Sequence, residues 1–194
     1  MAGRAAFSSA GEGPVGSDVD DAYLVRRAQE GYVDAYADLV DRHGGLAYRV
    51  ALRLLGNHHD AEDVAQEALV TAWQQLPGFR RNASFPTWLY QIVTRRSLNR
   101  ITRTRVTESL DLLGDVGDPG DEPGQHAERD LTVDAVTAAV TALPPPQRVA
   151  IVLHHFEGLS NAEIALITGS SIPAVRSHLF RGRRTLTKTL AEWR

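Results

Sequence analysis

Helical periodicity runs through this chain from Asp20 almost to its end, and no other feature of the sequence constrains the fold as strongly. It is clearest over residues 61–76, where apolar side chains recur every three or four positions without a break. Asp60 is placed to cap this helix, and Pro77-Gly78 ends it. No segment shows the apolar–polar alternation of a strand over any length. The sequence therefore predicts an all-α fold.

Shorter stretches with the same spacing flank residues 61–76. Three of them precede it, and each leads to a glycine: to Gly31, to Gly44-Gly45 and to Gly56. Because glycine is common where helices end, we expect a helix to stop at each of these positions. After a loop, Pro86 can open a further helix from its first position, where a missing N–H leaves no hydrogen bond unmade.

Composition divides the helical pattern into two small helical domains. Residues 104–130 contain eight acidic side chains against two arginines, with Gly and Pro scattered through them. Such a segment repels itself, so it predicts a flexible acidic linker. The first residues are small, Gly-rich and aperiodic. We therefore expect a disordered leader at 1–19, a helical domain at 20–103, the linker at 104–130 and a second helical domain at 131–194.

The second domain carries the pattern of a helix-turn-helix. Ser160 and Glu163 have the spacing of a capping box, which starts a short helix. Gly169 permits a tight turn after that helix, and the small Ala165 lets the next helix cross closely. Small and apolar residues then recur at helical spacing and define the buried stripe of the next helix: Val175, Leu179, Gly182 and Leu186.

Positive charge is concentrated in two short stretches, although the chain has a formal net charge of -3. Residues 80–103 contain six arginines and no acid, and residues 171–194 contain five arginines and Lys188 against Glu192 alone. Phosphate binding needs local potential rather than net charge, so both stretches favour contact with DNA. A solvated Arg-rich surface helix is the alternative for the second stretch, and the surrounding helix-turn-helix pattern disfavours it.

Aromatic residues lie among the arginines of the first stretch: Phe79, Phe85, Trp88 and Tyr90. Aromatic rings beside arginines can stack unpaired bases and hold the backbone next to them. Phe85 and Trp88 are equally well explained as core residues of a small helical domain. The helix at 61–76 has an acidic outer face, and its simplest interpretation is a solvated surface.

Four motifs together resemble those of a known family. They are DAEDVAQEALVTAWQQL at 60–76, FRRNASFPTWLYQI at 79–92, LPPPQRVAIVLHHFEGLSNAEIA at 143–165 and AVRSHLFRGRRTL at 174–186. Their order and separation are similar to those of group 4, or extracytoplasmic-function (ECF), sigma factors of the sigma-70 family. These proteins are the dissociable promoter-recognition subunits of bacterial RNA polymerase. The resemblance covers residues 22–103 and 131–190.

The resemblance implies a sigma region 2 bundle, a region 4 helix-turn-helix and three sets of site residues. The acidic helix would dock on the coiled coil of the largest subunit of core RNA polymerase through Asp60, Glu62, Asp63, Gln66 and Glu67. The flap of the polymerase would be a further contact. The -10 promoter element would be read and melted by Phe79, Arg80, Asn82, Ala83, Ser84, Tyr90, Arg95, Arg96 and Asn99. The -35 element would be bound by Arg176, Ser177, Phe180, Arg181 and Arg184, the last of them on a phosphate. Many members are held inactive by an anti-sigma factor.

Two other classes of protein share parts of the pattern. Residues 160–179 also resemble the DNA-binding domain of LuxR-type response regulators, but those proteins carry an α/β sensory domain, and residues 20–103 show no strand pattern. A metal enzyme would need ligands at a recognisable spacing, which is absent around His58-His59 and His154-His155. The sequence also lacks a nucleophile triad motif and a phosphate-binding glycine loop. We therefore expect no catalytic residue, metal or cofactor.

The absence of cysteine excludes disulfides and thiolate metal sites. No apolar run is long enough to span a bilayer, and the N-terminus lacks the apolar core of a signal peptide. These features predict a cytoplasmic protein without membrane insertion.

Overall fold

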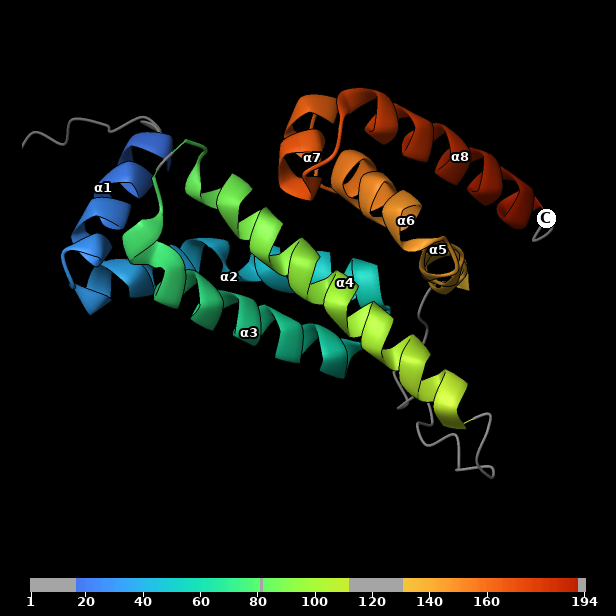
Figure 1. The fold of residues 1–194 in the computed structure, drawn as a ribbon, viewed down its shortest axis with the longest axis horizontal. Coiled ribbons are helices and arrows are strands. Elements are labelled where there is room, and N and C mark those ends of the chain that lie inside the picture. The colour runs from blue at the N-terminus through green and yellow to red at the C-terminus, as the bar shows by residue number, and fades with distance from the viewer. Residues whose placement is uncertain (1–16, 81, 112–130, 192–194) are drawn as a thin grey trace, which may run out of the picture.

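The computed structural model describes residues 17–80, 82–111 and 131–191, and the surroundings of side chains within 21–104 and 135–191. Every element in these ranges is helical, so the predicted all-α fold is confirmed (Figure 1). Within them, no helix is long and apolar enough to cross a membrane. The predicted leader and linker fall largely on residues 1–16 and 112–130, which lie outside the described part of the chain.

The first domain is built from α1 (Ser17–Gln29), α2 (Val33–Leu55), α3 (His58–Gln75), the 3₁₀ turn η1 (Leu76–Gly78) and α4 (Phe85–Asp111). α2, α3 and α4 contact one another pairwise, and α1 packs across α2. The face that α3 buries consists mainly of alanine, which lets the neighbouring helices approach closely. Large side chains fill the space between the helices, among them Leu39, Leu54, Leu89 and Val93, and all four are fully buried.

The predicted break at Gly44-Gly45 is wrong, because α2 runs unbroken through both glycines. Its buried face continues on either side of the pair, with Leu39 before it and Val50 after it. Each glycine disfavours a helix by about 1 kcal/mol, whereas burial of one large apolar side chain contributes about 1.5–3 kcal/mol. Packing of α2 against α3 and α4 therefore outweighs the local preference of the two glycines against a helix.

Helix ends also differ in detail from the sequence prediction. The cap of α3 is Asn57 rather than Asp60, since the Asn57 side chain accepts from the Asp60 N–H at 2.9 Å. α4 begins at Phe85, one residue before Pro86, and the Ser84 hydroxyl accepts from the Thr87 N–H. α4 continues to Asp111, past the predicted boundary at 103, because a formed helix gains one hydrogen bond for each added residue.

The second domain contains α5 (Leu131–Thr141), α6 (Pro145–Ile151), the π-helical turn η2 (Val152–Phe156), α7 (Asn161–Thr168) and α8 (Ile172–Ala191). The capping box is present, and Gly169 turns the chain with a φ of 64°. Val175, Leu179 and Gly182 are buried as predicted. A Cβ atom at Gly182 would lie 2.8 Å from Cγ1 of Ile151, so this glycine allows α8 to pack directly on α6.

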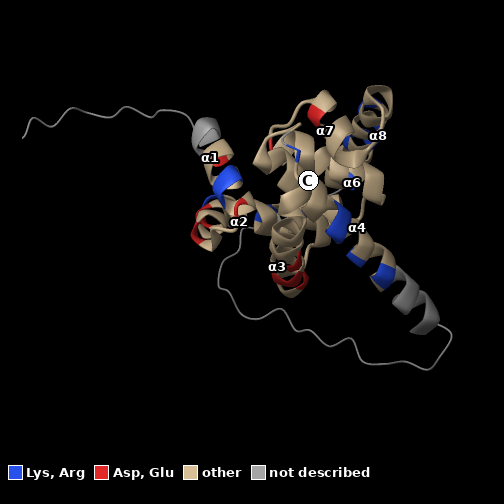
Figure 2. Ribbon diagram, turned by 60° about the vertical axis from the view of Figure 1, so that its left-hand side comes forward, with Lys and Arg blue, Asp and Glu red and all other residues tan. Residues whose placement is uncertain are grey.

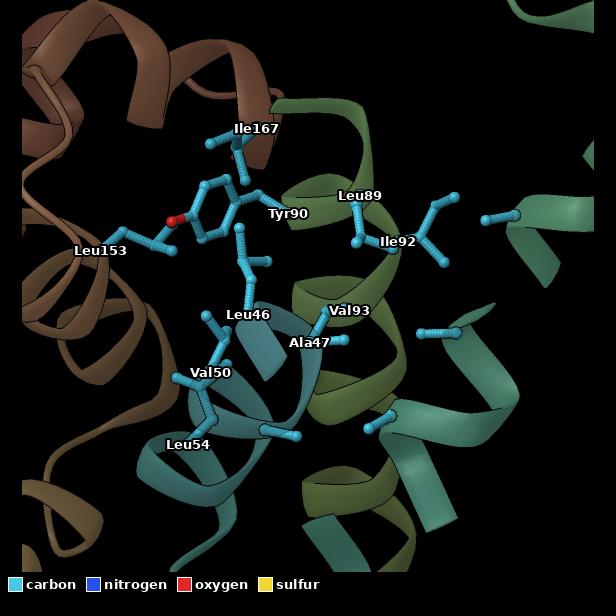
Figure 3. Packing of buried hydrophobic residues seen from close by; sticks show 14 of the residues in the cluster. Leu46, Ala47, Val50, Leu54, Leu89, Tyr90, Ile92, Val93, Leu153 and Ile167 are labelled. Atoms are coloured by element: carbon cyan, nitrogen blue, oxygen red, sulfur yellow. The ribbon is translucent and has the colours of Figure 1, made fainter. Parts of the chain in front are cut away.

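The two domains pack against each other. α2 contacts α5 and η2, and α4 contacts α6 and α7. Buried residues of both domains form one continuous core, in which the Tyr90 ring lies close to Leu153 and Ile167 of the second domain (Figure 3). The helix-turn-helix is therefore held directly on the first domain.

Candidate nucleic-acid interface

The outer face of α8 carries one large apolar side chain among basic ones. Phe180 is 67% exposed, which is unusual for a side chain of its size. Arg176, Arg181 and Arg184 are also exposed, and within the described part of the chain they make no hydrogen bond or ion pair. Ser177 is half-buried beside them. The residues predicted to contact a DNA groove thus share one solvent-facing surface.

Arg183 behaves differently from the other arginines of α8. Its Nε donates to Nε2 of His155 at 3.0 Å, so it is tied to the body of the second domain. Burial lowers the pKa of His155, and the adjacent Arg183 lowers it further. A neutral imidazole is the form that can accept this hydrogen bond, so the pair is compatible with neutral pH.

The loop at 79–84 borders a hollow in the first domain. This cavity of about 430 Å³ lies between the loop and α1, and its lining residues are Asp21, Ala22, Val25, Phe79, Asn82, Ala83, Ser84 and Phe85. The Phe79 ring stacks on Trp88 with centroids 4.5 Å apart, whereas Phe85 is buried as a core residue. Gln29 anchors the loop by donating to the carbonyls of Leu76 and Phe79, each at 2.9 Å. Sequence reasoning missed Gln29, because the contact spans about fifty residues of chain.

A second, more polar hollow lies between α3 and α4. Its volume is about 400 Å³, and its lining includes Trp88 together with Gln75, Gln91, Arg95, Arg96 and Asn99. Arg96 donates to the Thr71 hydroxyl at 2.7 Å and to Glu67 at 3.2 Å. Seven of the nine residues predicted for the -10 element line these two hollows: Phe79, Asn82, Ala83 and Ser84 the first, and Arg95, Arg96 and Asn99 the second. The two places are neighbours, because Trp88 borders the groove and stacks on Phe79 of the loop.

The structure does not bring Tyr90 to either hollow. Tyr90 is 8% exposed and points toward the second domain, where its hydroxyl donates to Glu157 at 3.0 Å (Figure 3). Burial raises the pKa of Tyr90, and the neighbouring carboxylate raises it further, so the phenol stays protonated. In this arrangement of the domains, its ring is not accessible to a base.

Acidic residues lie along α3 and basic residues along the neighbouring α4 (Figure 2), and several of them form ion pairs. Arg100 forms an ion pair with Asp60 and a longer one, 3.5 Å, with Asp63. Arg96 pairs with Glu67. Glu62 and Gln66 are exposed on the same helix. The spacing offers a signal for this pairing, since Asp63 and Glu67 are four residues apart and so are Arg96 and Arg100.

Within the residues that the structure describes, no group of three or more His, Asp or Glu side chains could hold a metal ion. The surfaces assembled here are instead a basic helix face, an aromatic hollow and an acidic helix partly covered by arginine. Such an arrangement suits binding to a polyanion at two places and to a protein at a third.

Comparison with known proteins gives consistent matches to both domains. Residues 39–107 match the family described as Sigma-70 region 2, and residues 134–186 match Sigma-70, region 4. The chain is 31% identical over 178 residues to the ECF RNA polymerase sigma factor SigW of Bacillus subtilis, an alignment that covers 87% of this chain and 95% of that protein. It is 35% identical over 185 residues to the ECF RNA polymerase sigma factor SigE of Mycolicibacterium smegmatis, covering 92% of this chain and 69% of that protein.

A solved structure shares the fold. This is the sigma factor RpoE in complex with the anti-sigma factor NepR from Bartonella quintana, with a TM-score of 0.64 and 27% sequence identity. The match covers 80% of this chain and 96% of that chain, so it includes both helical domains.

Proposed function

This chain belongs to the ECF sigma factors of the sigma-70 family, and we propose that its two helical domains divide the promoter between them. As a sigma factor it binds core RNA polymerase and directs promoter-specific initiation at -35 and -10 elements. We assign region 2 and the -10 element to residues 20–103, and region 4 and the -35 element to residues 131–194. Residues 104–130 connect the two.

The exposed face of α8 is the observation that carries the -35 assignment. A helix-turn-helix places its second helix in the major groove, where arginine can contact guanine and an apolar side chain can contact the thymine methyl group. Arg176 and Phe180 occupy successive turns of the exposed face of α8, with Arg181 beside Phe180, and the capping box fixes the preceding helix. Arg184 lies one turn further on, so we assign it to a phosphate.

The loop hollow supports an assignment to the -10 element. Its volume of about 430 Å³ leaves room for a base turned out of the duplex, and Asn82 and Ser84 can hydrogen-bond to the edge of that base. Arg80 is exposed beside the loop, and Arg95, Arg96 and Asn99 line the adjoining groove. These residues are suited to holding the displaced strand.

Melting then follows from binding alone. A protein that binds the opened strand more tightly than the duplex shifts the equilibrium toward the open form. We therefore assign no catalytic residue, metal or cofactor to this chain. Since its partner is core RNA polymerase, its place of action is the cytoplasm.

The acidic face of α3 is our candidate for the polymerase contact, through Asp60, Glu62, Asp63, Gln66 and Glu67. Carboxylates that already attract Arg96 and Arg100 are equally suited to basic residues of a partner. An anti-sigma factor is a further partner that we propose, because the RpoE structure with the same fold was solved with one bound.

A pair of arginine variants tests the -35 assignment. In holoenzyme bound to promoter DNA, Arg176→Ala should relax base preference at one -35 position, with a loss of about 1–3 kcal/mol at the preferred base. Arg184→Ala should weaken all promoters equally and lower the slope of log affinity against log salt by about 1. Arg26→Ala, an exposed arginine of α1, serves as the control. Unchanged -35 preferences in Arg176→Ala would remove the assignment.

A further inference from the structure

The hollow beside the loop at 79–84 has a carboxylate on its far wall. Among the residues that line it in the described part of the chain, Asp21 of α1 is the only charged one. The residues assigned to base capture in this hollow all belong to the loop, whereas Asp21 lies on the α1 side. A base held in the hollow would therefore lie between the loop and a carboxylate.

Two side chains of α2 hold the Asp21 carboxylate in place. Arg42 donates to its Oδ1 at 3.2 Å, and Nε2 of His43 lies 2.7 Å from its Oδ2. The Asp21 side chain is only 7% exposed. A buried charge is tolerated when it is paired and hydrogen-bonded, and here both oxygens are engaged. The carboxylate is therefore a fixed feature of the wall.

The carboxylate lies toward the Phe85 end of the hollow. The His43 ring that contacts Asp21 also packs against the Phe85 ring, with centroids 5.5 Å apart, and Phe85 lines the same hollow. An ionised carboxylate can accept about four hydrogen bonds and can donate none. The contacts with Arg42 and His43 use two of these positions, so acceptor positions remain for a ligand.

An acceptor of this kind distinguishes thymine from the other DNA bases. Adenine, cytosine and guanine each carry an exocyclic amino group, which can donate to a carboxylate. Thymine carries carbonyl oxygens instead, one on each side of its single N–H, and these would lie against the negative charge. The Asp21 wall therefore favours a base with an amino group and disfavours thymine.

The loop wall is less selective than the Asp21 wall. Asn82 is exposed, and its amide can both donate and accept a hydrogen bond. Ser84 has the same ability, and its hydroxyl already lies 2.9 Å from that of Thr87. Groups that can adopt either role accommodate several bases, so the fixed acceptor is the group that discriminates among them.

We propose that Asp21 determines base identity in the -10 element, by requiring an exocyclic amino group on the base captured in the loop hollow and by excluding thymine. This inference rests on the proposed function, because it needs the hollow to capture a base. Arg42 and His43 do not line the hollow, so they act as positioning residues for the carboxylate. A hydrogen bond to a charged group changes affinity roughly 10- to 150-fold.

Promoters that differ at one base measure this preference in the holoenzyme. The captured position is the one in the non-template strand at which Asn82→Ala alters base preference. With the unsubstituted chain, the preferred base there should carry an amino group and should support open-complex formation at least about tenfold better than thymine. Asp21→Asn keeps the shape but replaces one acceptor oxygen by an amide NH₂, so it should reduce this ratio by about tenfold.

Removal of the amino group from the DNA identifies the contact. Purine, 2-pyrimidinone and hypoxanthine are the counterparts of adenine, cytosine and guanine that lack it. Substituting the counterpart of the preferred base should cost the unsubstituted chain about tenfold in open-complex formation, and should cost Asp21→Asn severalfold less, because contacting groups are not additive. An equal loss in both proteins would show that the amino group does not meet Asp21.

Asp21 also ties α1 to α2, and a matched variant separates that structural role. Arg42→Gln weakens the same ion pair from a residue outside the hollow, while His43 still holds the carboxylate. Both variants should lower the midpoint of urea unfolding, but only Asp21→Asn should change the ranking of bases. The same change of ranking in Arg42→Gln would overturn the inference.

The remaining outcomes distinguish this inference from the proposed function. Asn82→Ala may alter base preference near -10 while Asp21→Asn leaves the ranking intact, or thymine may be the preferred base. Either result would overturn the role of Asp21 and leave base capture in the hollow standing. If Asn82→Ala altered no downstream position, the hollow would capture no base, and the -10 assignment would fall together with the inference.

Discussion

Single residues connect surfaces that the proposed function assigns to different partners. Arg96 lines the groove assigned to DNA, yet it also donates to Thr71 and to Glu67 on the face assigned to polymerase. Arg100, one turn further along α4, binds Asp60 and Asp63 of the same face, and its hydrogen bond to Asp60 raises the pKa of the guanidinium. Under the proposed function, a partner that engages Glu67 would thus change the surroundings of Arg96, which lines the groove assigned to DNA.

Ser160 allows a residue-scale test of the helix-turn-helix. Its hydroxyl and backbone N–H bond to Glu163 and lower the pKa of that carboxyl below its usual 4.5. A lowered folded-state pKa contributes stability above about pH 4.5, and that contribution is lost as pH falls through the folded value. Ser160→Ala should therefore reduce the free energy of unfolding by about 0.5–2 kcal/mol at pH 7. Urea unfolding should show a smaller difference at pH 3.5, and a constant difference would contradict this assignment.

Phe79 tests the base-capture hypothesis at the same scale. Stacking of a base on an aromatic ring contributes roughly 1–3 kcal/mol, so Phe79→Ala should reduce melting while duplex binding stays nearly intact. Permanganate reactivity of thymines in the bubble reports melting, and a mobility shift on duplex promoter reports binding. Equal losses in both measurements would instead identify Phe79 as a core residue, in keeping with its stacking on Trp88.

At the scale of elements, α4 contacts three different neighbours, each with a different face. Leu89 and Val93 pack into the first domain, Arg96 and Arg100 face α3, and Tyr90 faces the second domain. A helix that packs against neighbours on three sides carries buried residues around much of its surface, which explains why its amphipathic pattern is weak in the sequence. The three roles become visible only once the neighbouring helices are in place.

The acidic face of α3 gives an element-scale prediction. Asp63→Asn together with Glu67→Gln should weaken binding to core polymerase by a few kcal/mol if the pairs formed there are desolvated. Asp34→Asn with Asp38→Asn on α2 is the matched control, since those two acids are also exposed and four residues apart. Circular dichroism checks that both variants stay helical. Undiminished co-purification of the α3 variant with polymerase would exclude this face.

Local features of the fold were predictable from sequence, and features that depend on distant residues were not. The Ser160 capping box and the Gly169 turn involve neighbours in the chain, and both are present as predicted. The break expected at Gly44-Gly45 fails, because packing of α2 on two other helices decides that region. The position of Tyr90 in the sequence groups it with the base-binding aromatics, and only the second domain, through Glu157, explains its burial.

At the scale of the whole molecule, the structure packs the two domains together, whereas the proposed function places them on two separated promoter elements. The packed arrangement buries one continuous core across both domains. Separating the two domains would expose the part of this core that they share, so the free energy of separation must come from contacts that only the separated domains can make. Under the proposed function, polymerase and two separated DNA elements are the partners that would supply such contacts.

Selection from a randomised promoter library tests the division of the promoter most directly. Holoenzyme with the unsubstituted chain should enrich two sequence elements at a fixed spacing, near -35 and -10. Arg176→Ala should alter base preference in the upstream element alone, and Asn82→Ala in the downstream element alone. The account would be contradicted if the unsubstituted chain enriched no pair of elements, or if both variants altered the same one.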